Sequence, residues 1–105
     1  MAQNASISGR WSVTADFYGT AIHIPLELKE EGGKLMGKAG GDPLEGTLKG
    51  NAIHFVSKDE QGGTVECTAT IEGGVITGSA VFTDADDKAH PTTHQLTATP
   101  VPKRV

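Results

Sequence analysis

Apolar and polar side chains alternate through eight short segments of this chain. In the first segment every second residue is apolar, at Trp11, Val13, Ala15 and Phe17. Successive side chains of a β-strand point to opposite faces of the sheet, so a period of two predicts strands rather than amphipathic helices. The same alternation recurs near residues 22–29, 34–39, 44–49, 52–57, 65–72, 75–82 and 93–98.

Glycine-rich pairs separate most of these segments. They recur at intervals of about ten residues, at Gly32-Gly33, Gly40-Gly41, Gly50-Asn51, Gly62-Gly63 and Gly73-Gly74. Glycine readily adopts the positive φ that tight hairpin turns require. Short strands separated by regular turn signals are typical of an all-β sandwich or barrel.

A sheet of eight antiparallel strands with one apolar face must bury that face. Closing the sheet on itself does so and also removes both sheet edges. We therefore predict an all-β fold, an eight-stranded antiparallel up-and-down meander closed into a small barrel, with a two-sheet β-sandwich as the alternative. Gly37, Gly46 and Gly78 fall on the inward face, where they favour sharp coiling, and Pro25 indicates an edge or a bulge in the second segment.

The 105 residues are enough for one domain. We expect a single β-barrel domain over 1–105, with 1–7 as an N-terminal extension, 84–91 as a long acidic loop and 101–105 as a tail. The first residues lack the basic and apolar regions of a signal peptide. The chain is therefore expected to be cytoplasmic, or exported with its leader removed.

Charge and composition narrow the range of partners. The net charge of -4 argues against nucleic acid. No apolar run approaches the roughly 18–20 residues of a membrane span. The single cysteine excludes an intramolecular disulfide. The partner that we expect is a small ligand, apolar or of mixed polarity.

Two stretches of the sequence resemble known β-barrel families. Ile7-Ser8-Gly9-Arg10-Trp11 opens the first segment with Gly-x-Trp, and Gly33-Lys34-Leu35-Met36-Gly37 follows at the second hairpin. Both resemble the calycins, the superfamily of lipocalins, fatty-acid-binding proteins and avidins, and most of all the avidin-type start. Leu44-Glu45-Gly46 and Ile76-Thr77-Gly78 also resemble small, largely uncharacterised bacterial β-meander domains. The resemblance implies a small barrel but not biotin binding, since the chain has one tryptophan.

Three residues are candidates for a ligand-binding site inside the barrel. His94 is in phase with the apolar Leu96 and Ala98, so we expect its ring to face inward. The last strand of a closed barrel pairs with the first, which would bring His94 near Trp11 or Val13. An imidazole beside an indole in an apolar cavity is a typical mixture for a small-molecule site. Cys67 is also inward in phase, so the predicted ligand-binding residues are His94, Trp11 and Cys67.

Two other functions stay open on the sequence. A small enzyme could use His94 with a carboxylate or with Cys67, although the chain has no recognisable catalytic motif. An interaction module could bind a protein or a polysaccharide through its outer face. His90 and His94 would lie about 13 Å apart on a strand, too far for ligands of one ion. We therefore expect neither a metal nor a cofactor, and the oligomeric state stays open.

Overall fold

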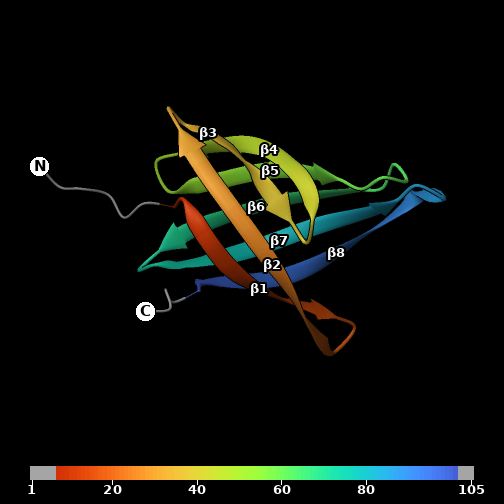
Figure 1. Cartoon of the computed structure of the whole chain (residues 1–105). Coiled ribbons are helices and arrows are strands. Elements are labelled where there is room, and N and C mark those ends of the chain that lie inside the picture. The colour runs from red at the N-terminus through yellow and green to blue at the C-terminus, as the bar shows by residue number, and fades with distance from the viewer. Residues whose placement is uncertain (1–6, 102–105) are drawn as a thin grey trace, which may run out of the picture.

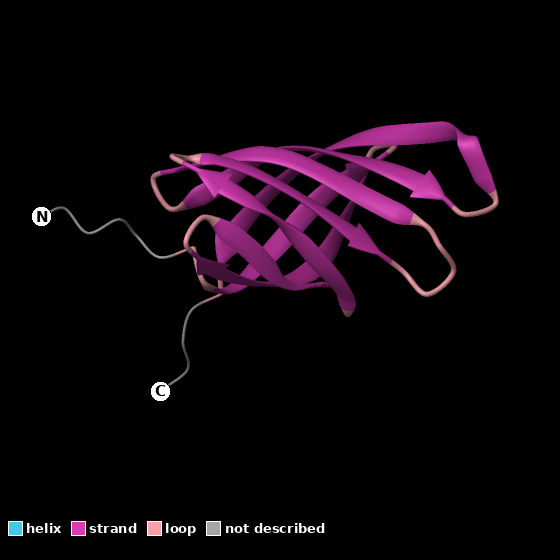
Figure 2. Cartoon of the chain, turned by 90° about the horizontal axis from the view of Figure 1, so that it is seen from above, coloured by secondary structure: helices cyan, strands magenta, loops and turns pink. Residues whose placement is uncertain are grey.

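The computed structural model describes residues 7–101, and within them every regular element is a strand (Figures 1 and 2). Residues 1–6 and 102–105, which make up most of the expected extension and tail, lie outside the described residues. The strands are β1 (Gly9–Phe17), β2 (Thr20–Glu31), β3 (Lys34–Ala39), β4 (Asp42–Lys49), β5 (Ala52–Lys58), β6 (Thr64–Glu72), β7 (Val75–Asp84) and β8 (Asp87–Pro100).

The strands follow one another around a closed barrel in chain order. Each strand pairs antiparallel with the next, and β8 closes the barrel on β1 between the pairs Trp11 with Pro100 and Ala15 with Leu96. The predicted eight-stranded meander is confirmed, and the two-sheet sandwich is excluded. Closure removes most of the free edges that an open sheet would expose.

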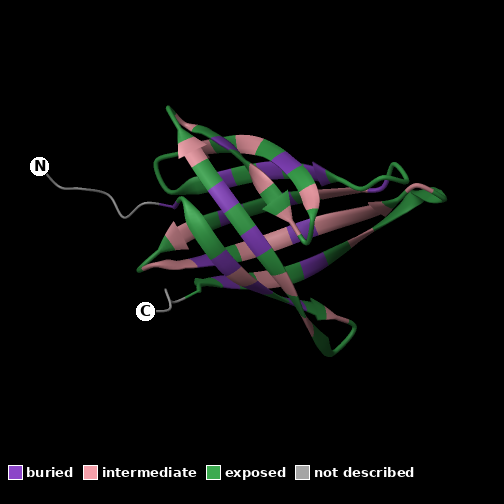
Figure 3. Cartoon of the chain, in the orientation of Figure 1, coloured by how far each residue is buried: buried purple, intermediate pink, exposed green. Residues whose placement is uncertain are grey.

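The alternation seen in the sequence corresponds to the inside and outside of this barrel. Along the strands, buried and exposed residues follow one another with a period of two (Figure 3). The buried apolar residues form one core inside the barrel, made of Ile7, Trp11, Val13, Ala15, Leu26, Leu28, Leu35, Leu44, Ile53, Phe55, Cys67, Ala69, Ile76, Ala80 and Ala98. Ile7, at the end of the expected extension, belongs to this core.

The barrel has two ends, which we name after the residues that lie there. The Trp11 end carries the turns 32–33, 50–51 and 73–74. The His94 end carries the turns 18–19, 40–41 and 85–86 and the loop 59–63. The β1–β2 and β7–β8 hairpins extend apart at the His94 end (Figure 1), because the ladder between β1 and β8 stops at the pair of Ala15 and Leu96.

The expected acidic loop over 84–91 is wrong. The β7–β8 ladder continues past an irregularity between Phe82 and Asp84 as far as the pair of Asp84 and Asp87, so residues 87–91 are strand. Because this part of β8 extends beyond the barrel, both of its faces are exposed and residues 87–91 carry no apolar alternation.

The inward glycines lie where neighbouring strands approach too closely for a side chain. A Cβ at Gly46 would overlap the carbonyl oxygen of His54, and one at Gly78 would overlap that of Thr68. Gly37 has the same relation to Glu27. The close approach of the strands at these three positions supports the prediction that the glycines permit sharp coiling of the barrel wall.

Candidate functional site

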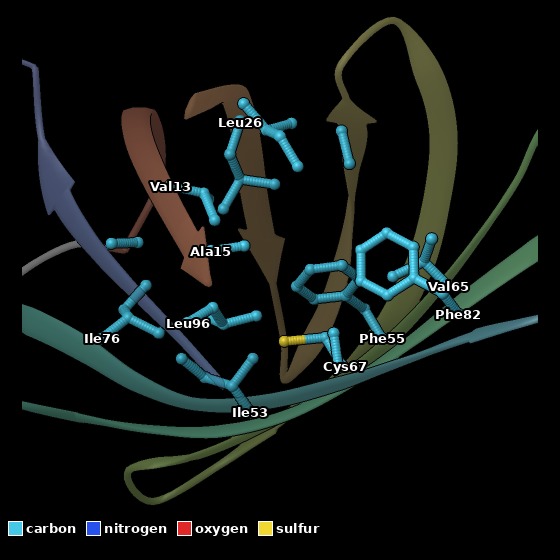
Figure 4. A pocket seen from close by; sticks show the side chains of 14 residues that line it. Val13, Ala15, Leu26, Ile53, Phe55, Val65, Cys67, Ile76, Phe82 and Leu96 are labelled. Atoms are coloured by element: carbon cyan, nitrogen blue, oxygen red, sulfur yellow. The ribbon is translucent and has the colours of Figure 1, made fainter. Parts of the chain in front are cut away.

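The barrel encloses a cavity of about 50 Å³ whose lining is entirely apolar (Figure 4). Seven of the eight strands contribute, all except β4, through Val13, Ala15, Ile24, Leu26, Ala39, Ile53, Phe55, Val65, Cys67, Ile76, Ala80, Phe82, Leu96 and Ala98. Four of these positions are alanine, and their short side chains leave the space open. The volume is well below the roughly 300–1,000 Å³ of pockets that enclose drug-sized ligands. Only a small apolar group fits.

The lining is not uniformly buried. Val13, Ile53 and Cys67 are buried. The partly exposed lining residues are Ile24, Ala39, Val65, Phe82 and Leu96. Ala39 ends β3, Val65 is the second residue of β6 and Phe82 lies near the end of β7. These strand termini belong to the His94 end, so the cavity is reached from that end of the barrel.

His94 is buried at this end, 5% exposed, and both of its ring nitrogens have partners. The Nδ1–H donates to the carbonyl oxygen of Asp16 at 3.1 Å, because a carbonyl can only accept. In the neutral ring Nε2 then accepts from the hydroxyl of Thr92 at 2.9 Å. The first bond joins β8 to β1 where their backbone ladder has ended, so the imidazole ties the two diverging hairpins together.

Three aromatic rings surround this imidazole. The ring of Phe17 stacks on it, with centroids 3.9 Å apart and planes 9° from parallel. Phe82 and Tyr18 each meet it edge-on with centroids at 5.3 Å. Phe82 also lines the cavity. We call Phe17, Tyr18, Phe82 and His94 the ring cluster, and it lies at the mouth of the cavity.

Tyr18 holds an unusual backbone conformation in this cluster. Its φ is 54°, and no other non-glycine residue in the described part of the chain has a positive φ. Four other hairpin turns place glycine at the same position, with φ between 58° and 61°, at Gly32, Gly40, Gly50 and Gly73. A tyrosine there costs about 1–3 kcal/mol of backbone strain. The Tyr18 ring is 81% exposed and meets His94 edge-on at the mouth.

Trp11 lies at the opposite end of the barrel and Val13 pairs with Ala98, so the expectation that His94 lies near Trp11 or Val13 is wrong. Trp11 pairs with Pro100, whereas His94 lies beside Phe17, six residues further along β1 and about 20 Å away. The stagger of the strands moves the last strand past the first, and the sequence pattern does not reveal that shift. The indole N–H donates to the Ile7 carbonyl at 2.9 Å, and Trp11 is buried.

Cys67 faces the cavity, as its phase predicts (Figure 4). Burial raises the pKa of its thiol to about 12, so the reactive thiolate is absent at neutral pH. Cys67 pairs with Ala80, which pairs with His94, so Cys67 and His94 lie two strands and about 10 Å apart. Both imidazole nitrogens already have other partners. The arrangement is not that of a nucleophile and its base.

The other histidines face solvent, as expected for His23 and His54. His54 contacts Glu66 at 2.7 Å, His90 contacts Asp87 at 2.6 Å, and His23 contacts the hydroxyl of Thr14 at 3.2 Å. Within residues 7–101 no group of three His, Cys, Asp or Glu side chains is placed to hold a metal ion. Over the same residues no helix has the length and apolar character needed to cross a membrane.

Sequence comparison adds no relative to this picture. No protein-family model matches the chain, and no curated protein matches it. The class that fold and site define is a small closed β-barrel with an apolar cavity inside it.

We expect His94→Ala to lower the free energy of unfolding by about 1–2 kcal/mol, because it removes two hydrogen bonds and the stacking on Phe17. Amide hydrogen exchange should accelerate first in the β1–β2 hairpin, which loses its tie to β8. The matched control is His54→Ala, because the exposed contact of His54 with Glu66 contributes little to stability. Equal losses for the two variants in urea denaturation would contradict this role for His94.

Proposed function

We propose that this barrel is a binding module for a small apolar group, carried by a ligand whose remainder stays at the His94 end. The observation that supports it most is the wholly apolar cavity, whose lining residues become partly exposed only toward that end. Eight-stranded barrels have interiors of the size that side chains fill or one small ligand occupies. The calycin-like start at Gly9-Arg10-Trp11 agrees with this use of the interior.

The ring cluster at the mouth of the cavity supports the same proposal. Phe82 borders both the cavity and His94. Tyr18 presents an exposed ring beside His94, on a backbone with a positive φ. Flat aromatic walls around an apolar entrance suit the stem of an amphipathic ligand. Strain at such a position is typical of sites that contact a ligand.

Charge at the His94 end selects the polar part of the ligand. Within two residues of its turns and loop lie three lysines, Lys38, Lys58 and Lys88, and seven carboxylates, Asp16, Asp42, Asp59, Glu60, Asp84, Asp86 and Asp87. The resulting negative potential repels anions and attracts cations. The proposed ligand is therefore a compact amphipathic molecule with a branched apolar end and a cationic or neutral polar end.

Titration of the protein with isopentylamine, isopentanol and isovalerate tests this proposal by NMR. These probes share a branched apolar end and differ in charge. We expect the amine and the alcohol to shift the signals of Cys67 and Ala80, and the carboxylate to bind at least several-fold more weakly at low salt. Absence of shifts at cavity residues with all three probes would reject the proposal.

Two cavity variants and one control locate the binding. Ala80→Val and Ala15→Val narrow the cavity from different strands and are expected to abolish the shifts. Ala52→Val adds the same atoms at an exposed position of β5 and should leave them unchanged. Unchanged binding in folded Ala80→Val and Ala15→Val proteins would place the ligand elsewhere.

A further inference from the structure

The first half of β2 is bonded on one side only. β2 pairs with β1 from Thr20 to Leu28 but with β3 only from Leu26 onward. Residues 20–24 therefore form a free edge of the sheet, in the hairpin that extends from the barrel (Figure 1). A free edge presents unpaired backbone N–H and C=O groups, to which another strand can bond.

The hydrogen bond of Pro25 shows which residues of this edge point their backbone N–H and C=O groups away from β1. The Pro25 carbonyl accepts the N–H of Gly40 at 2.8 Å, so the backbone groups of Pro25 point away from β1. In an antiparallel strand the N–H and C=O of one residue point to the same side, and the side alternates along the chain. Ala21 and His23 share the phase of Pro25 and thus offer two donors and two acceptors to the free edge.

The composition of this edge contrasts with that of the free edge of β8. β8 pairs with β1 only from Leu96 to Pro100, which leaves residues 87–95 free on that side. That edge carries Asp87, Lys88 and Pro91, the charges and proline by which sheet edges avoid association. Residues 20–24 of β2 read Thr-Ala-Ile-His-Ile and contain no carboxylate, lysine, arginine or proline.

We propose that two copies of this chain associate through residues 20–24 of β2, paired antiparallel about a two-fold axis at Ile22. The backbone N–H and C=O of Ala21 in each copy then form hydrogen bonds with the backbone groups of the partner's His23. This pairing uses all four outward backbone groups of each edge. Ile22 lies opposite the partner's Ile22, and Thr20 lies opposite the partner's Ile24. A symmetric interface of this kind closes at two subunits.

The segment suits a second copy of itself because every opposed pair is compatible. β-branched side chains face one another at the positions of Thr20, Ile22 and Ile24, a favourable combination across strands. No two carboxylates and no two ammonium groups face each other across this interface. Ile22 and Ile24 are partly exposed in the single chain, and the partner strand would cover them. This pairing extends the barrel wall, and its only residue that also lines the cavity is Ile24.

A disulfide trap tests the two-fold pairing directly. Ile22→Cys places two thiols directly opposite each other across the axis, within the Cα separation that a disulfide tolerates. We expect rapid conversion to a species of twice the 10.9 kDa chain mass under mild oxidation. His23→Cys is the matched control, because its thiols are offset along the strands beyond that separation. The buried Cys67, whose thiol is protonated, does not compete.

A second pair of variants tests the hydrogen bonds without an added thiol. Ala21→Pro removes an outward N–H while leaving the bonds to β1, whereas Ala21→Val retains that N–H. Sedimentation equilibrium should give a dissociation constant about tenfold or more weaker for Ala21→Pro, which loses two of four bonds, than for Ala21→Val. A native chain that stays monomeric to millimolar concentration, larger open assemblies, or equal crosslinking of Ile22→Cys and His23→Cys would overturn the proposal.

Discussion

Replacing Trp11 with alanine is expected to lower the free energy of unfolding by about 3–5 kcal/mol. The indole is 5% exposed and fills the Trp11 end together with Ile7, Leu26 and Leu28. Removing it leaves a cavity that the hydrogen-bonded barrel wall cannot collapse to fill. The indole N–H also holds the chain at Ile7, because it donates a hydrogen bond to the Ile7 carbonyl. Both losses act on the same end of the barrel, so we expect the effect to be large.

Urea denaturation of Trp11→Ala measures this loss of stability. The variant Trp11→Phe separates the contribution of the apolar volume from that of the N–H. The phenylalanine variant keeps most of the apolar volume but lacks the N–H. Its free energy of unfolding should therefore fall by less than half as much as that of Trp11→Ala. The protein has one tryptophan, so native fluorescence reports on this site alone and should have the blue-shifted maximum of a buried indole. A loss below about 1 kcal/mol in the alanine variant would mean that Trp11 does not close this end.

The alternation of side chains was sufficient to predict the eight strands, and the need to bury one face of the sheet favoured the barrel over a sandwich. Each inward set, such as Val65, Cys67 and Ala69 on β6, lies inside or at the mouth of the barrel as its phase requires. Hairpins between consecutive strands pair neighbours with a register that the glycine turns fix. Strand phase, turn type and strand order are local properties, and the sequence determines them segment by segment.

The composition of the site was less predictable because it depends on how the barrel closes. His94 is buried as its phase with Leu96 predicts, but its neighbours are Phe17, Tyr18 and Phe82 rather than Trp11. Which residues of β1 and β8 oppose each other is set by the stagger accumulated around the whole barrel, which no single segment encodes.

The position of Tyr18 in its turn was a local signal that the sequence contained. Tyr18 occupies the first position of a two-residue turn where the comparable turns have glycine. A bulky residue at a position that demands positive φ indicates that its side chain compensates the strain elsewhere, and here the ring contacts His94. Comparing equivalent turn positions within one chain could therefore have singled out Tyr18 without a structure.

Closure of the barrel depends on the small size of its inward glycines, and Gly46 offers the cleanest test. Gly46 pairs with Leu35 on one side and Phe55 on the other. A Cβ built on it would overlap the His54 carbonyl and lie 2.5 Å from the Cβ of Phe55. Unlike Gly37, whose φ is 149°, Gly46 does not have a positive φ. Alanine at this position is therefore opposed by lack of space rather than by backbone conformation.

We expect Gly46→Ala to lower the free energy of unfolding by about 3 kcal/mol, the upper part of the usual range for overpacking, because backbone atoms must move to admit the methyl group. Gly78→Ala should behave alike, since its Cβ would overlap the carbonyl of Thr68. The matched control is Thr47→Ala, next to Gly46 on the exposed face of β4, with a loss of about 0.5 kcal/mol or less. Urea denaturation followed by circular dichroism measures all three variants. If the two glycine variants were as stable as Thr47→Ala, β4 and β5 could not be as close as the geometry at Gly46 requires, and the coiling of the barrel wall would need another cause.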